Sequence, residues 1–115
     1  MNYEDHKDLI RGMGCICTLK RPAVPHHIDS QRHHHDLLTI PLHYELHQGK
    51  EGIHTISKKV WQRMWGNEYD LLAKTWRKLP DGYVRELVGA LKQDRRIVKR
   101  LQMHGSHRLR DLLGG

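Results

Sequence analysis

Residues 25–54 read PHHIDSQRHHHDLLTIPLHYELHQGKEGIH, and this stretch decides the fold. It opens inside an apolar, strand-like segment over residues 23–28 that carries the pair His26-His27. A polar loop over 29–35 separates that segment from a second short apolar one, Leu37 to Ile40. Short apolar runs bounded by polar residues in this way predict two β-strands.

A helix is predicted directly after the second strand. It is expected over residues 41–48, and Gly49 is a typical residue at the position after a helix. His43 and His47 are four residues apart, so within a helix both imidazoles would face the same side. Two strands and a helix that bring histidines to one point predict a compact metal-binding unit.

The motifs in this stretch, with a pattern further along the chain, resemble a known family. They are PHHI at 25–28, DLLTIPLH at 36–43, HQG and GIH within 47–54, and W…WG…YDLL over 61–72. In this order they are similar to phage and prophage HNH endonucleases of the recombination-enhancement, RecA-dependent type. The resemblance covers residues 15–72, about half of the chain. It implies an α+β fold, in which a small ββα-metal (His-Me) finger is followed by a helical C-terminal part.

The resemblance also implies roles for individual residues. The pair that ends the first strand supplies a metal ligand and then the general base, which implies His26 as the ligand and His27 as the base. Adjacent strand residues point to opposite faces, so the two cannot share a role, and the exchanged assignment is the main alternative. Asp36 matches the middle position of the motif, where it would orient the base or hold the loop. His47 matches the last helical ligand, and His54 matches a recurrent downstream histidine that would complete the site.

The chemistry implied by the family is hydrolysis of a DNA phosphodiester with one divalent cation and one histidine. The histidine takes a proton from water, while the metal holds a non-bridging oxygen and the leaving 3′-oxygen. Mg²⁺ or Mn²⁺ is expected for catalysis, and Zn²⁺ or Ni²⁺ can also occupy a histidine site. Because a purely structural site has no need of an unliganded base, the doubled histidine favours an enzyme.

A second, structural zinc site is incomplete in this sequence. Relatives often carry CxxC before the first strand and a PLC cysteine with a further ligand three residues later. Here the spacing is Cys15-x-Cys17, His43 stands in place of the PLC cysteine, and Leu46 follows three residues on. Zinc binding and a role as small core residues both stay open for the cysteines. His43 could instead turn toward the catalytic metal.

Length and composition predict one domain, residues 1–115, with the ββα-metal core at 15–55 and helices at 56–104. Only 37% of the residues are apolar and most large ones lie in the second half, so a metal would help to hold the first half together. The acidic N-terminus has no apolar segment, and no membrane span is predicted. With two cysteines one residue apart, the expected location is a reducing cytoplasm, and the resemblance implies that of a bacterial host cell.

Further helices are predicted at 3–11, 57–66, 67–79 and 83–103. Ser57 and Asn67 are typical N-cap residues. Cys15–Lys20 is expected to form a strand or a knuckle, and the polar tail after Gly105 is expected to fray. Three tryptophans at helical spacings are expected to be core anchors rather than base-stacking platforms: Trp61, Trp65 and Trp76.

Basic residues gather near the C-terminus. Between residues 92 and 110 there are seven against one acid, and this difference of +6 nearly equals the net charge of +7 of the whole chain. The seven are Lys92, Arg95, Arg96, Lys99, Arg100, Arg108 and Arg110. Such a helix face suits phosphate contacts without sequence readout, and a plain solvated face is the alternative. Lys58, Lys59 and Arg63 form a second basic group just after His54, nearer the expected chemistry, and they are also predicted to bind nucleic acid.

These features together predict a metal-dependent HNH endonuclease, a hydrolase acting in bacteriophage DNA recombination or DNA processing. DNA is the expected partner, and a RecA-type recombinase filament is a partner for part of the resembling family. One alternative is a non-catalytic, metal-stabilised DNA-binding recombination accessory protein. It is favoured because His26 stands where members of the resembling family often carry an aspartate before the base, and because the cysteine set is incomplete. Another is a small metal-binding regulator whose basic helix contacts DNA or a protein.

Overall fold

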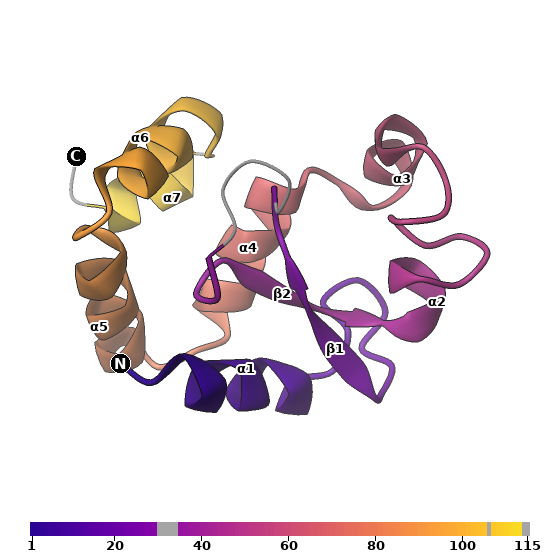
Figure 1. The fold of residues 1–115 in the computed structure, drawn as a ribbon, viewed down its shortest axis with the longest axis horizontal. Coiled ribbons are helices and arrows are strands. Elements are labelled where there is room, and N and C mark those ends of the chain that lie inside the picture. Colours follow the sequence, from indigo (N-terminus) through magenta and orange to yellow (C-terminus); the bar gives the residue numbers. More distant parts are fainter. Residues whose placement is uncertain (30–34, 106, 114–115) are drawn as a thin grey trace.

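The computed structural model describes residues 1–29, 35–105 and 107–113, and at 107 and 108 only the backbone. Residues 30–34 of the predicted loop and the side chain of Arg108 therefore lie outside the described part. The elements in Figure 1 are α1 (Tyr3–Gly12), β1 (Ala23–His27), β2 (Thr39–His43), α2 (Tyr44–His47), α3 (Lys58–Trp65), α4 (Glu68–Arg77), α5 (Asp81–Leu91), α6 (Arg95–His104) and α7 (His107–Leu112). The predicted α+β class is confirmed.

The two strands form an antiparallel sheet at the centre of the molecule. Their pairing runs from Ala23 opposite His43 to His27 opposite Thr39. The sheet packs against α1 and α4. Figure 1 shows α2 and α3 gathered at one end of the molecule, and α5, α6 and α7 at the other.

The prediction for β2 and α2 was wrong by several residues. Residues 41–43, which were expected to begin a helix, continue the strand because they pair with residues 23–25 of β1. His43 then caps the single turn of α2, where its Nδ1 accepts a hydrogen bond from the N–H of Glu45 at 3.3 Å. His43 and His47 therefore do not share a helical face.

The long helix predicted over 83–103 is two helices, α5 and α6. Between them Asp94 adopts an extended conformation, with φ −106° and ψ 102°. Its carboxylate accepts hydrogen bonds from the N–H groups of Arg96 at 3.0 Å and Ile97 at 3.3 Å. Asp94 is thus an N-cap. The apolar stripe did not reveal the break, because both halves have helical spacing.

The tail after Gly105 forms α7, so the prediction of a frayed tail was wrong. Leu109 is fully buried, Leu113 is nearly so, and α7 packs against α6 and α4. Gly105 permits the tight return of the chain, because a Cβ atom there would lie 2.3 Å from the carbonyl oxygen of Leu101. Two well-spaced leucines are enough to hold this short helix on the core.

Several local predictions are confirmed. Ser57 and Asn67 cap α3 and α4, and α1 covers the segment predicted at 3–11. Trp61 and Trp76 are fully buried, and Trp65 packs against the same core. The indole N–H of Trp61 donates to the carbonyl oxygen of Leu46 at 3.0 Å, which fixes α3 beside α2.

One apolar core serves both halves of the chain. Ile28, Ile40 and Leu42 from the first half are fully buried in the same cluster as Leu72 and Leu87 from the second. The apolar residues of the first half therefore pack on the helices of the second. None of the described helices has the length and apolar character needed to cross a membrane.

Replacement of the buried leucine of α7 tests whether this helix belongs to the core. Leu109→Ala should lower the free energy of unfolding by about 2–5 kcal/mol, because it leaves a cavity in a fully buried position. Leu112→Ala is the matched control in the same helix, and it should cost less because Leu112 is 40% exposed. The measurement is denaturant unfolding. Equal and near-zero losses for the two variants would mean that the tail does not pack.

Candidate metal centre

Three histidines from separate segments come together at one point. His26 lies in β1, His47 ends α2, and His54 lies in the turn that follows. One ring nitrogen from each can be chosen so that all three lie within 4.8 Å of one another. The ring centroids are 5.2 Å apart for His26 and His47, 5.1 Å for His26 and His54, and 4.6 Å for His47 and His54. These side chains can hold a metal ion, as predicted for each of them.

The turn between His47 and His54 is built by its glycines. The N–H of His54 donates to the carbonyl oxygen of His47 at 3.1 Å, and the N–H of Gly52 donates to that of Gly49 at 2.9 Å. A Cβ atom at Gly52 would lie only 2.6 Å from the carbonyl carbon of His47, so a side chain does not fit there. The tight return brings the Nε2 atoms of His47 and His54 to 3.0 Å.

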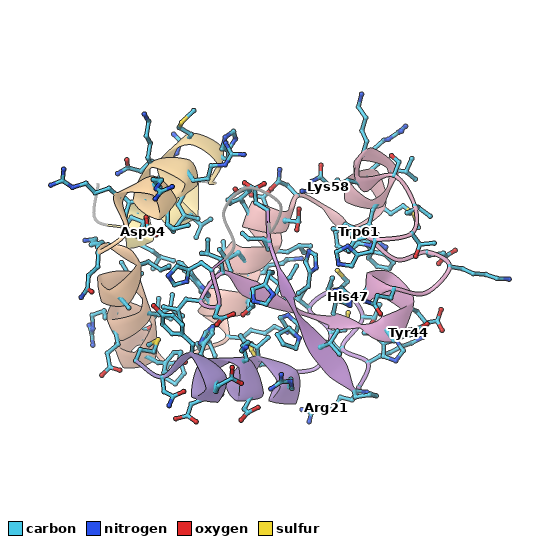
Figure 2. All side chains as sticks on the ribbon, viewed as in Figure 1. Arg21, Tyr44, His47, Lys58, Trp61 and Asp94 are labelled. Atoms are coloured by element: carbon cyan, nitrogen blue, oxygen red, sulfur yellow. The ribbon has the colours of Figure 1, made fainter. Side chains whose placement is uncertain are left out.

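His26 is held by a carboxylate that the sequence did not reveal. Its Nε2 donates to Oε2 of Glu68 at 2.7 Å, and Glu68, the first residue of α4, is only 3% exposed. The other oxygen, Oε1, lies 2.6 Å from Nζ of Lys58. Lys58, His47 and Trp61 occupy the same half of the molecule in Figure 2. A carboxylate bound to a ligand histidine fixes the ring orientation and is typical of metal sites.

Nothing local marks Glu68 as a site residue. It follows the N-cap Asn67, and acidic residues in the first turn of a helix are common because they favour the helix dipole. Only its burial against His26, a residue of the sheet, distinguishes it.

His43, the fourth predicted ligand, is not part of the cluster. In the described part of the chain the only group of three or more metal-binding side chains is that of His26, His47 and His54. His43 instead caps α2 through its Nδ1. The strand pairing that keeps residue 43 extended is the physical reason.

The predicted catalytic pair lies on the other face of β1. Nε2 of His27 donates to Oδ1 of Asp36 at 2.7 Å. Lys7 of α1 adds a positive charge, with its Nζ 3.7 Å from the same oxygen. An imidazole held in this way has a defined orientation, as a general base requires. The catalytic roles of His27 and Asp36 stay predictions.

Burial keeps the imidazoles of His47 and His54 neutral. Burial, followed by the charges of His26 and His54, lowers the pKa of His47 to about 4. Burial and the charge of His26 also lower the pKa of His54. Neutral imidazole is the form that binds a metal ion, so at neutral pH no proton has to leave these two rings.

Glu68 is ionised despite its burial. Burial raises the pKa of this carboxyl group, but the hydrogen bonds from His26 and Lys58 outweigh that effect and the net pKa is lowered. The centre therefore contains a fixed negative charge beside its histidines.

The two cysteines form a knuckle rather than a strand. The N–H of Cys15 donates to the carbonyl oxygen of Lys20 at 2.9 Å, and Leu19 donates to that of Cys15 at 2.8 Å. A hydrogen bond from the thiol of Cys17 is the main reason that the pKa of Cys15 is lowered to about 4, against the effect of burial. Both thiols are free, and they do not join a third metal-binding side chain among the described residues.

Most of the residues predicted to contact DNA are exposed, but one is hydrogen-bonded within the protein. Arg95, Arg96 and Lys99 of α6, with Lys59 and Arg63 of α3, are exposed. Arg100 is engaged, since its Nε donates to Oδ2 of Asp29 at 2.8 Å. The hydroxyl group of Tyr69 donates to the same oxygen at 2.8 Å, so Asp29 joins the chain just after β1 to α4 and α6.

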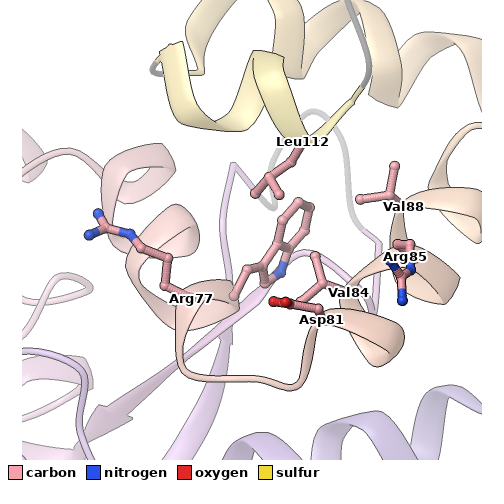
Figure 3. A pocket seen from close by; sticks show the side chains of 7 residues that line it. Arg77, Asp81, Val84, Arg85, Val88 and Leu112 are labelled. Atoms are coloured by element: carbon pink, nitrogen blue, oxygen red, sulfur yellow. The ribbon is translucent and has the colours of Figure 1, made fainter.

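A separate pocket lies between α4, α5 and α7. Its volume is about 320 Å³, and Figure 3 shows Arg77 and Arg85 on opposite sides of it with Asp81 between them. The remaining lining residues are Trp76, Val84, Val88 and Leu112. None of the predicted site residues lines this pocket.

Comparison with known proteins adds no relative: no protein-family model, curated protein or solved structure matches the chain. The metal centre is therefore supported by its own geometry.

Protonation of the cluster should destabilise the metal-free protein in acid. The pKa of His47 is about 4 in the folded chain against 6.5 for a free imidazole. Between these values the unfolded chain binds a proton that the folded chain does not, so stability falls as pH decreases from about 6.5 toward 4. Melting temperatures with EDTA at pH 7 and pH 5 should show this loss. His47→Gln should reduce the difference, whereas His104→Gln, at an exposed position, should not. If the melting temperatures of His47→Gln at pH 7 and pH 5 differ as much as those of the wild type, the lowered pKa of His47 is contradicted.

Proposed function

We propose that this protein is a metal-dependent HNH-type endonuclease that hydrolyses DNA phosphodiester bonds in bacteriophage recombination or DNA processing. The observation that supports this most is that three histidines predicted as metal ligands come together at one point. His26 belongs to a cluster of three imidazoles that can hold a metal ion. His27 is not in that cluster and is hydrogen-bonded to Asp36 instead. The motif order predicts a division between metal binding and proton transfer for these two residues.

The residues of the chain act as follows in this proposal. Asp36 accepts a hydrogen bond from Nε2 of His27 and so fixes the orientation of the ring. His27 takes a proton from water as the water oxygen bonds to phosphorus and the bond to the 3′-oxygen breaks. A bound divalent metal supplies positive charge for the non-bridging oxygen and the departing oxygen. Glu68 keeps His26 oriented toward the other two histidines.

The three nitrogen ligands favour transition metals over Mg²⁺. Mg²⁺ and Mn²⁺ prefer oxygen ligands, whereas imidazole suits Ni²⁺ and Zn²⁺. Affinity is expected to rise from Mn²⁺ to Ni²⁺, in the usual order for such sites. We propose that Ni²⁺ or Zn²⁺ binds these histidines most tightly, while Mg²⁺ or Mn²⁺ remains the catalytic metal that the resemblance implies.

Histidine variants separate proton transfer from metal binding. His27→Ala should slow plasmid cleavage by about 10²–10⁴-fold, the usual contribution of a general base, with Ni²⁺ affinity retained. His47→Ala should lose both metal binding and cleavage, and His104→Ala should lose neither. Cleavage is measured by plasmid nicking with Mn²⁺, and metal binding by calorimetry. Wild-type nicking by His27→Ala would exclude it as the base.

The alternative is a metal-stabilised DNA-binding accessory protein without catalysis. The buried Glu68–His26 contact favours it specifically, because such a pair also suits a permanent structural site. The same assays distinguish the two proposals. An accessory protein would bind Ni²⁺ and DNA through the same residues and would not nick DNA with any metal.

The exposed basic residues of α6 are proposed to bind DNA phosphates. Replacing Arg95, Arg96 and Lys99 by glutamate should weaken binding to all sequences and lower the salt slope by roughly one unit for each phosphate that is no longer neutralised. The matched control places the same three charge changes at Arg77, Lys78 and Arg85, which are also exposed. Binding is measured by fluorescence anisotropy at several salt concentrations. Equal effects of the two triple variants would mean that only net charge matters. A RecA-type filament stays a predicted partner.

A further inference from the structure

Glu68 connects the metal centre to a lysine of the neighbouring helix α3. Its Oε2 accepts from His26 at 2.7 Å, and its Oε1 accepts from Nζ of Lys58 at 2.6 Å. A buried carboxylate is destabilising unless its partners compensate for lost hydration. With both oxygens occupied by donors, Glu68 meets that condition. One side chain therefore fixes the position of the Lys58 ammonium relative to His26.

Lys58 is accessible although Glu68 is not. Its side chain is 51% exposed. An ammonium group has three N–H donors, and the contact with Glu68 uses one. The other donors can bind an anion while the contact with Glu68 is kept. His54 is exposed as well, so the centre itself is open to solvent.

When a divalent metal ion is bound, the net charge of the centre favours binding of an anion. The imidazoles that bind metal are neutral, and the charges of Glu68 and Lys58 cancel. The double positive charge of a divalent ion is then left without compensation. Three protein ligands also leave coordination positions open. A phosphate group can supply oxygen atoms to the metal and accept from the lysine at the same time.

We propose that Lys58 and the metal held by His26, His47 and His54 form a two-part binding site for a phosphodiester. Glu68 is the positioning residue, because it holds the ammonium beside the centre and orients His26. The inference rests on the proposed function and names the residue that binds the scissile phosphate. Lys59, the next residue, is exposed and has no contact with Glu68 in the described structure.

The test uses Co²⁺-loaded protein and dimethyl phosphate, a diester that needs no DNA-binding surface. Visible absorption of Co²⁺ reports both metal binding and a change in its ligands. Dimethyl phosphate should alter the spectrum with saturation, and Lys58→Gln should weaken its binding by about 10- to 100-fold, as expected for a missing charge-assisted hydrogen bond. Lys59→Gln should change it by no more than about twofold, since an exposed charge is screened. Lys58→Arg should retain most of the binding.

Binding of Co²⁺ itself distinguishes failure of the two-part site from failure of the proposed function. Lys58→Gln should bind Co²⁺ as tightly as the wild type or more tightly, because a positive charge near the ion has been removed. If Co²⁺ binds but Lys58→Gln and Lys59→Gln have equal effects on dimethyl phosphate, the two-part site is overturned and the proposed nuclease is not. If Co²⁺ does not bind to the wild type, both proposals are overturned. A lack of DNA cleavage with the expected phosphate binding would overturn only the proposed function.

Discussion

Pairing between β1 and β2 places Ile40 opposite His26 and Thr39 opposite His27, so the two histidines face opposite sides of the sheet. A shift of the register by one residue would exchange them. The register continues beyond β1, where the N–H of Ile28 donates to the carbonyl oxygen of Leu38 at 2.9 Å. It is also favoured by the burial of Ile40 and Leu42 in the core. The position of every histidine in the candidate site depends on this pairing.

The buried carboxylate of Glu68 links the sheet to the neighbouring helices. It contacts His26 on one side and Lys58 on the other, so β1, α3 and α4 meet at one ionised group. Replacing a partner by a side chain that cannot donate a hydrogen bond would leave the buried charge without compensation, which is strongly destabilising. The contact thus contributes to the fold and to the orientation of a metal-binding ring. A metal ion would add a further constraint on the same part of the molecule.

The proposed chemistry depends on keeping two kinds of imidazole apart. Those of His47 and His54 are kept neutral mainly by burial and by neighbouring histidines. His27 is paired with a carboxylate instead, and Lys7 adds a positive charge next to that carboxylate. The first environment suits metal binding, and the second fixes the orientation of the ring. The two environments belong to adjacent residues of β1.

The sequence by itself determined the features that depend on near neighbours. The apolar segments predicted two strands, Ser57 and Asn67 predicted helix starts, and the motif order predicted that His26, His47 and His54 would meet. Asp94 was an equally local signal for a helix start, but the continuous apolar stripe concealed it. Tertiary structure alone decided that residue 43 stays in a strand, because its conformation is set by pairing with Ala23. It also decided that Glu68 belongs to the site, since this residue lies 42 positions from His26 and meets it only when α4 docks on the sheet. Local patterns report backbone preferences over a few residues, whereas burial of a charge against a distant partner depends on the packing of the whole chain.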